Sequence, residues 1–112
     1  MKHIDSNAHG HRVWAEIDLG ALTHNYEVCA QYIHAAKPDA PVVAVIKADA
    51  YGHGAAAAVC ALYDKGCRHF AVASLAEGTE LRHALADAPA GVTAHARTES
   101  CEILVLGYTD PP

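Results

Sequence analysis

The sequence lacks both an excess of positive charge and a long apolar run. It has 8 lysine and arginine residues against 13 aspartate and glutamate residues in 112 positions, a formal net charge of −5. Such a mildly acidic chain has no electrostatic basis for binding nucleic acid or an anionic membrane. No stretch reaches the roughly 18 consecutive apolar residues of a transmembrane helix, and residues 1–12 contain no hydrophobic segment of a secretory signal. These absences favour a cytoplasmic protein.

Closely spaced cysteine pairs are also missing. The 4 cysteines stand far apart and none forms a CxxC motif: Cys29, Cys60, Cys67 and Cys101. In a chain expected in the cytoplasm, reduced thiols are the simplest interpretation. Histidine is frequent, with 9 residues. The pair His9 and His11 nevertheless has no cysteine or carboxylate at ligand spacing, so we predict no metal site.

Large apolar side chains are scarcer than the hydrophobic content of 52% suggests, because 24 of the 112 residues are alanine. Apolar patterns predict strands at 12–19, 42–46, 68–75 and 102–106. Helices are predicted at 19–36, 52–66 and 74–85. The alternation indicates an α/β fold with βαβ winding around a parallel sheet, in which the run 42–46 is covered on both faces. We expect a flexible lead-in at 1–12 and one domain over 13–112.

Local signals mark where these helices begin and end. Asp18 is placed to cap the first helix. The apolar face of that helix repeats at steps of four, three and four: Leu22, Tyr26, Cys29 and Ile33. Ser74 and Glu77 have the spacing of a capping box at the start of the third helix, and Gly66 closes the second. Residues 86–101 carry Pro and Gly without a sustained apolar period, which predicts a mobile long loop or a helix extension.

A lysine stands at the end of the apolar run 42–46. Parallel α/β folds present functional residues at the carboxyl ends of their strands, so Lys47 is expected at the mouth of the sheet. A lysine partly desolvated by apolar neighbours loses its proton more easily than a free one, and a neutral amine can form a Schiff base with an aldehyde. The alternative is a lysine that only extends from a buried strand into solvent. The spacing alone favours neither interpretation.

The residues after Lys47 favour a binding role. Tyr51 follows four positions on. Gly52 and Gly54 permit a tight turn before the next helix, whose first amide groups can receive an anion. A GxG pattern is a weak signal by itself, and His53 within it is equally explained as a turn or capping residue.

Four segments, in order along the chain, resemble the N-terminal part of bacterial alanine racemases and of the related serine/alanine racemase domains. They are "WAEIDLGALTHNY", "VVAVIKADAYGHG", "FAVASLAEGTELR" and "ILVLGYTDP". The resemblance covers residues 13–85 and 102–111. Because several ordered motifs match within one short chain, chance similarity is a poor explanation.

The resemblance implies a pyridoxal-phosphate enzyme that interconverts L- and D-alanine and so supplies D-alanine for peptidoglycan. It implies that the chain is the N-terminal portion of a (β/α)₈ barrel, with three βα-type units and the barrel incomplete. By position, Lys47 matches the lysine that holds the cofactor aldehyde and serves as one of two bases. Tyr51 matches the tyrosine that contacts the cofactor phosphate. Val45 and Leu104–Leu106 would line the barrel near the cofactor ring.

In the family a β-rich C-terminal domain follows the barrel, and the second base is a tyrosine from that domain of the partner subunit in a homodimer. A complete barrel needs about 250 residues, so this chain is expected to be an N-terminal piece that is inactive alone. Three alternatives stay open. The first alternative is that the substrate is serine rather than alanine. The second is that the chain belongs to another group of pyridoxal-phosphate proteins with the same barrel. The third is that it is a non-enzymatic remnant or interaction module.

Overall fold

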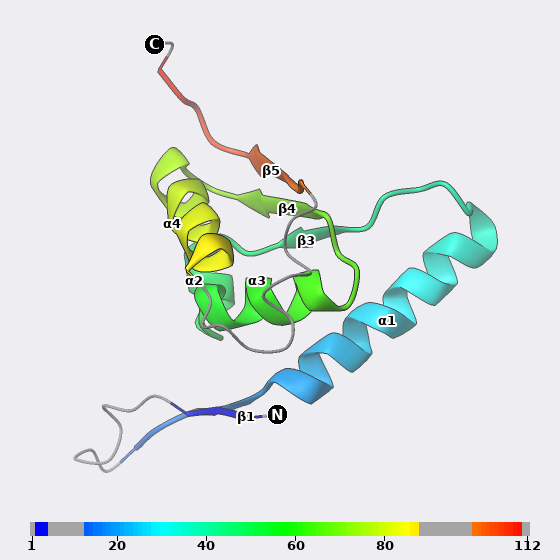
Figure 1. Ribbon diagram of the computed structural model, residues 1–112, viewed down its shortest axis with the longest axis horizontal. Helices are drawn as coiled ribbons and strands as arrows, with labels where there is room; N and C mark the ends of the chain where they lie inside the picture. Colours follow the sequence, from blue (N-terminus) through cyan, green and yellow to red (C-terminus); the bar gives the residue numbers. More distant parts are fainter. Residues whose placement is uncertain (1, 5–12, 88–99, 111–112) are drawn as a thin grey trace.

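Three parallel strands and the helices that follow them form the centre of the molecule. The computed structural model describes residues 2–4, 13–87 and 100–110. In chain order these contain β1 (Lys2–Ile4), β2 (Glu16–Asp18), α1 (Leu19–Ala36), β3 (Val43–Val45), α2 (Lys47–Tyr51), α3 (Ala55–Asp64), β4 (His69–Val72), α4 (Leu75–Ala86) and β5 (Glu102–Val105). Strands β3, β4 and β5 pair in parallel in that order, and α3 and α4 lie side by side on one face of their sheet (Figure 1). The predicted α/β alternation around a parallel sheet is confirmed.

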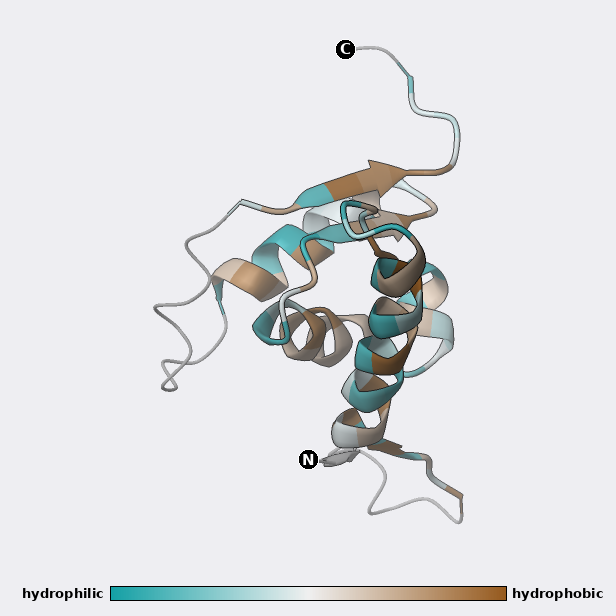
Figure 2. Ribbon diagram, turned by 90° about the vertical axis from the view of Figure 1, so that its right-hand side faces the viewer, coloured by the Kyte–Doolittle hydropathy of each residue, from teal (hydrophilic) through white to brown (hydrophobic). Residues whose placement is uncertain are grey.

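The core lies between this sheet and the two helices. Phe70 and Val72 of β4 are buried in one cluster with Val59 and Tyr63 of α3 and Leu81 of α4. Figure 2 shows that strongly hydrophobic residues are concentrated in the strands, whereas α1 carries a mixture of hydrophobic and hydrophilic residues. Burial of each large apolar side chain contributes about 1.5–3 kcal/mol. This layer therefore fixes the strands from which the site is built.

The opposite face of the sheet is open within the described residues. Val45 of β3 is 38% exposed and Leu104 of β5 is 57% exposed. The register aligns Val45 with Ala71 and Ala71 with Leu104, so the three side chains share this face, and the small Ala71 between the two larger residues is itself buried. The prediction that the strand within 42–46 is covered on both faces is wrong for this structure, because the helices pack against one face only.

The two N-terminal strands form a separate antiparallel pair, with Lys2 opposite Asp18. The strand predicted at 12–19 is therefore shorter than expected, and its partner is β1 instead of the parallel sheet. Residues 2–4, predicted as part of a flexible lead-in, form a strand because pairing satisfies the backbone groups that face each other. Residues 5–12 lie outside the described part of the chain.

Helix α1 begins as predicted, with the Asp18 side chain accepting a hydrogen bond from a first-turn amide at 3.1 Å. Leu22 and Tyr26 pack against the core. Cys29 and Ile33 are exposed, because the second half of the helix extends beyond α3 (Figure 1). The predicted apolar face is thus correct for the first half of the helix and wrong for the second.

The segment predicted as a long loop, 86–101, is described only at its ends. Helix α4 ends at Ala86, and Cys101 is buried just before β5. Residues 88–99 lie outside the described residues, so the mobility of this segment stays a prediction. In the ranges that the structure describes, no helix combines the length and hydrophobicity needed to cross a bilayer.

All four cysteines are free thiols in the structure. Cys67 is buried in the core cluster, and this burial raises the pKa of its thiol. The thiol therefore stays neutral and packs as a small apolar side chain.

Candidate functional site

Lys47 lies at the carboxyl end of β3, where the sequence places it. Ile46 before it is buried and donates a backbone hydrogen bond of 2.8 Å to Ala71 of β4. Lys47 itself is half-buried, and its amine makes no hydrogen bond or ion pair with any residue that the structure describes. Its position is one at which parallel α/β folds present functional groups, and a primary amine in its neutral form can form a Schiff base with a carbonyl group.

The four residues after Lys47 form a left-handed turn, defined here as residues 48–51. The φ angles of Ala48, Asp49, Ala50 and Tyr51 are 53, 55, 56 and 56°. The left-handed conformation costs about 1–2 kcal/mol per residue when a Cβ is present, so other contacts must hold this turn. The sequence predicts a tight turn from its glycines, but the strain falls on the residues before them. Neither alanine nor tyrosine signals such a conformation.

A side chain within the turn and one just after it stabilise the turn. The Asp49 carboxylate accepts a hydrogen bond of 2.7 Å from the amide of Ala55, the first residue of α3. The Nδ1 atom of His53 lies 2.9 Å from the Ala50 carbonyl oxygen and donates to it. His53 therefore contacts the turn directly, as one of the two sequence interpretations expects. Together these bonds join the turn to the start of α3.

A second carboxylate, that of Glu77, reaches the turn from α4. Glu77 accepts a hydrogen bond of 2.8 Å from the amide of Ala48 through Oε2, and one of 2.7 Å from the amide of Ala73 through Oε1. These amide hydrogen bonds, first from Ala73 and then from Ala48, lower the pKa of Glu77, and the charge of Lys47 adds to the effect. Sequence reasoning identified Glu77 only as a helix cap. The predicted capping box is confirmed at Ser74, whose hydroxyl accepts a hydrogen bond of 3.2 Å from the Glu77 amide.

Tyr51 and Val45 border a common apolar hollow of about 280 Å³ beside β3. The other lining residues come from α1, α3, the end of β3 and the turn with His53, and Lys47 is not among them. Tyr51 is 61% exposed. Leu104 and Leu106 are also exposed, and Leu104 shares the open sheet face with Val45. The structure thus gathers the predicted residues around the carboxyl end of the sheet. Tyr51 and Val45 share a hollow, but Lys47 and the two leucines lie outside it.

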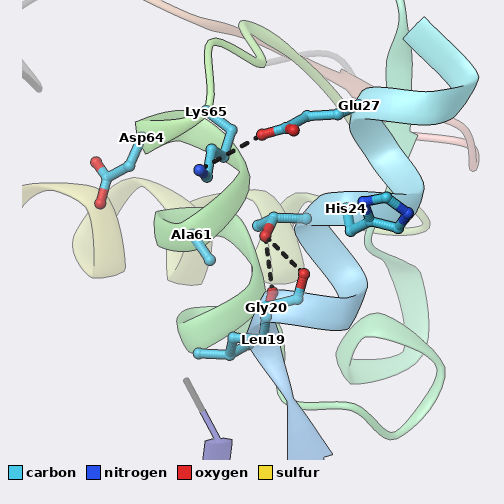
Figure 3. Close-up of a pocket in the computed structure, with 8 residues that line it drawn as sticks. Leu19, Gly20, His24, Glu27, Ala61, Asp64 and Lys65 are labelled. Atoms are coloured by element: carbon cyan, nitrogen blue, oxygen red, sulfur yellow. Dashed lines mark hydrogen bonds and ion pairs between the residues drawn. The ribbon is translucent and has the colours of Figure 1, made fainter.

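A second hollow, of about 380 Å³, lies between α1 and α3 (Figure 3). Its charged groups already have partners, since Lys65 and Glu27 form an ion pair of 3.4 Å. The hydroxyl of Thr23 donates to backbone carbonyl oxygens of its own helix. No predicted site residue lines this hollow, so we treat it as a groove between two packed helices. Within the described ranges no three His, Cys, Asp or Glu side chains are arranged to hold a metal ion.

The fold and the site define the class of protein as a parallel α/β domain with a lysine at a strand end. The sequence profile of the alanine racemase N-terminal domain matches residues 17–110. The chain is 40% identical over 99 residues to the alanine racemase of Carboxydothermus hydrogenoformans, covering 88% of this chain and 22% of that protein. It is 45% identical over 101 residues to that of a Synechocystis species, covering 90% of this chain and 23% of that protein.

The chain belongs to the alanine racemase family. The resemblance seen in the sequence is therefore confirmed, and so is the fold class, the N-terminal portion of a (β/α)₈ barrel with an open sheet. The chain spans 22% to 23% of the length of these curated relatives.

Proposed function

We propose that this chain is the lysine-bearing N-terminal part of a pyridoxal-phosphate-dependent alanine racemase. The observation that carries the proposal is the amine of Lys47 at the carboxyl end of β3, which has no hydrogen-bond or ion-pair partner among the described residues. It stands directly before a turn that is held by the Glu77 side chain of α4 and by the turn's own Asp49, which bonds to the first amide of α3. The donor set fits the cofactor: a primary amine for its aldehyde and an exposed phenol, Tyr51, for its phosphate. When bound, pyridoxal phosphate supplies an electron sink for charge at the substrate Cα.

The residues of this chain have separate roles in the proposal. Lys47 holds the cofactor and, when released, moves a proton to or from one face of the substrate Cα. The hydroxyl of Tyr51 orients the cofactor phosphate. The exposed apolar side chains of Val45, Leu104 and Leu106 exclude water from one side of the cofactor ring, whereas Val105 between the two leucines packs against the core instead.

Racemisation also needs a group on the opposite face of Cα, because the proton is removed from one face and returned to the other. We propose that this group is a tyrosine from a further domain of a partner subunit, so that the active form is a homodimer. The substrate is alanine, with serine as the alternative, and the product D-alanine serves peptidoglycan synthesis. The cytoplasmic location and the division into a lead-in over 1–12 and a barrel domain over 13–112 stay part of the proposal.

Reductive labelling tests the role of Lys47. Pyridoxal phosphate and borohydride are added to the folded chain, and the labelled peptides are mapped. We expect Lys47 to be labelled ahead of the chain's other lysines, including Lys37 and the ion-paired Lys65, and Lys47→Ala to remove the major labelled peptide. Labelling in urea is the control, since unfolding removes any advantage of position. Equal labelling of all lysines in the folded chain would contradict the proposal.

A further inference from the structure

The carboxylate of Glu77 bridges the loops that follow β3 and β4. We infer that Glu77 is a positioning residue, which fixes Lys47 for cofactor attachment by holding the peptide bond after it against the loop after β4. The inference rests on the proposed function, because it assigns Lys47 its role. Nothing in the family match or in the capping pattern assigns this contact across the sheet.

The two hydrogen bonds of Glu77 continue the pairing of β3 and β4 beyond the last backbone hydrogen bond between these strands. That last bond joins the Ile46 amide to the Ala71 carbonyl at 2.8 Å. Two residues further along each chain, the amides of Ala48 and Ala73 both donate, and Glu77 accepts both at 2.8 and 2.7 Å. Two donors cannot bond to each other, so a side chain with two acceptor oxygens takes the place of a backbone rung.

The contact acts directly on the reactive lysine. The amide of Ala48 belongs to the peptide bond that joins it to Lys47, so its hydrogen bond to Glu77 restricts the backbone of Lys47. It also holds the first residue of the left-handed turn, whose strain otherwise favours a return to right-handed or extended backbone. Asp49 holds the same turn from its α3 side. Glu77 is therefore the anchor nearest to Lys47.

Only a carboxylate fits this position. Both of its oxygens accept hydrogen bonds, and charge-assisted bonds of this length are the stronger kind. A glutamine has one accepting oxygen, and its amide nitrogen would face an N–H donor. Glu77→Gln therefore keeps the size and helix position of the side chain but must lose one of the two bonds.

The experiment compares the full 112-residue chain with Glu77→Gln and with Glu80→Gln as matched control. Glu80 lies on the same helix, is exposed, and makes no hydrogen bond or ion pair with a described residue. Amide hydrogen exchange is followed by NMR at Ala48, Ala73 and the buried Phe70. We expect exchange protection at Ala48 or Ala73 to fall about tenfold in Glu77→Gln, as for the loss of a charge-assisted hydrogen bond. Phe70 should stay protected, and Glu80→Gln should change none of the three.

Selective labelling with pyridoxal phosphate and borohydride gives the second readout. The ratio of Lys47 to Lys65 labelling should fall severalfold in Glu77→Gln only. Ser74→Ala removes the cap of α4 but leaves the carboxylate, so it separates helix stability from positioning and should leave this ratio unchanged. If Glu77→Gln does not fold, Glu77→Asp takes its place, since it keeps the charge but is one methylene too short to bridge both amides.

The outcomes separate the inference from the proposed function. Unchanged Ala48 and Ala73 protection in a folded Glu77→Gln variant would overturn the bridge itself. Lost protection with an unchanged labelling ratio, or an equal loss of the ratio in Ser74→Ala, would overturn the positioning role. A wild-type chain without preferential Lys47 labelling would refute the proposed function, whereas the exchange data would still test the bridge.

Discussion

Glu77 links the acid stability of the chain to its site. Its folded pKa lies below the ordinary value of 4.5 because two backbone amides donate to the ionised form. A depressed folded pKa contributes stability that is fully present above the ordinary value and is lost as the pH falls through the folded pKa.

We therefore expect a pH-dependent difference in unfolding free energy between the wild type and Glu77→Gln. Measured by urea denaturation, the difference should be largest near neutral pH and shrink as the pH falls below 4.5, where the wild-type carboxyl becomes protonated. Glu80→Gln serves as the control, because the Glu80 carboxyl accepts no such hydrogen bonds from backbone amides of the described residues. A difference that stays constant over the whole pH range would show that the bridge does not depend on the charge.

At the residue scale, the sequence predicts those features that depend on neighbouring residues in the chain. The cap at Asp18, the cap at Ser74 and the position of Lys47 after an apolar strand all follow from short-range patterns. The bridge from Glu77 to Ala48 joins residues 29 positions apart, so no local spacing reveals it. The left-handed turn is also missed, because contacts from other elements impose it against the preference of its residues.

At the scale of elements, the loops after β4 and β5 approach each other closely. The amide of Gly107 donates to the carbonyl oxygen of Ala73 at 3.1 Å. A Cβ added at Gly107 would collide with that same oxygen. At Gly78 on α4, an added Cβ would meet the side chains of Ile103 and Val72 at 3.6 Å, an ordinary contact distance.

These two glycines give a matched pair of substitutions. Gly107→Ala should destabilise the chain by about 1–3 kcal/mol, as expected for overpacking against backbone. Gly78→Ala should be neutral or stabilise it by up to about 1 kcal/mol, because alanine favours the helix. Urea denaturation measures both. If Gly107→Ala were as stable as the wild type, the two loops would not be in the described contact.

Among the helices and strands, some features can be predicted from the sequence and others cannot. The parallel strands and their helices follow from apolar patterns, because the apolar period of each element can be read within its own segment of the sequence. The exposure of Cys29 and Ile33 and the pairing of β1 with β2 depend on which elements lie nearby, and a helical period carries no such information. The open face of β3 was missed for the same reason: an apolar run indicates burial but not what provides it.

At the scale of the whole molecule, the proposal assigns to this chain one of the two proton-transferring groups that the reaction needs. In the proposal, Lys47 serves one face of the substrate, and the group on the opposite face is a tyrosine from a further domain of a partner subunit. Val45 and Leu104 are exposed on the open sheet face, so solvent reaches the side of the site that should exclude it.

We therefore expect that a polypeptide of these 112 residues, made alone, does not racemise alanine faster than free pyridoxal phosphate does. Loss of one positioned acid–base group costs about 10²–10⁴-fold in rate, and an open site adds a loss of cofactor orientation. The measurement follows D-alanine formed from L-alanine with purified chain and cofactor, against a protein-free control and against Lys47→Ala.

Labelling of Lys47 should still occur in the same sample, because attachment needs the strand end and the turn but not the second base. A rate well above the protein-free control that disappears in Lys47→Ala would mean that Lys47 and its surroundings suffice for proton exchange on both faces.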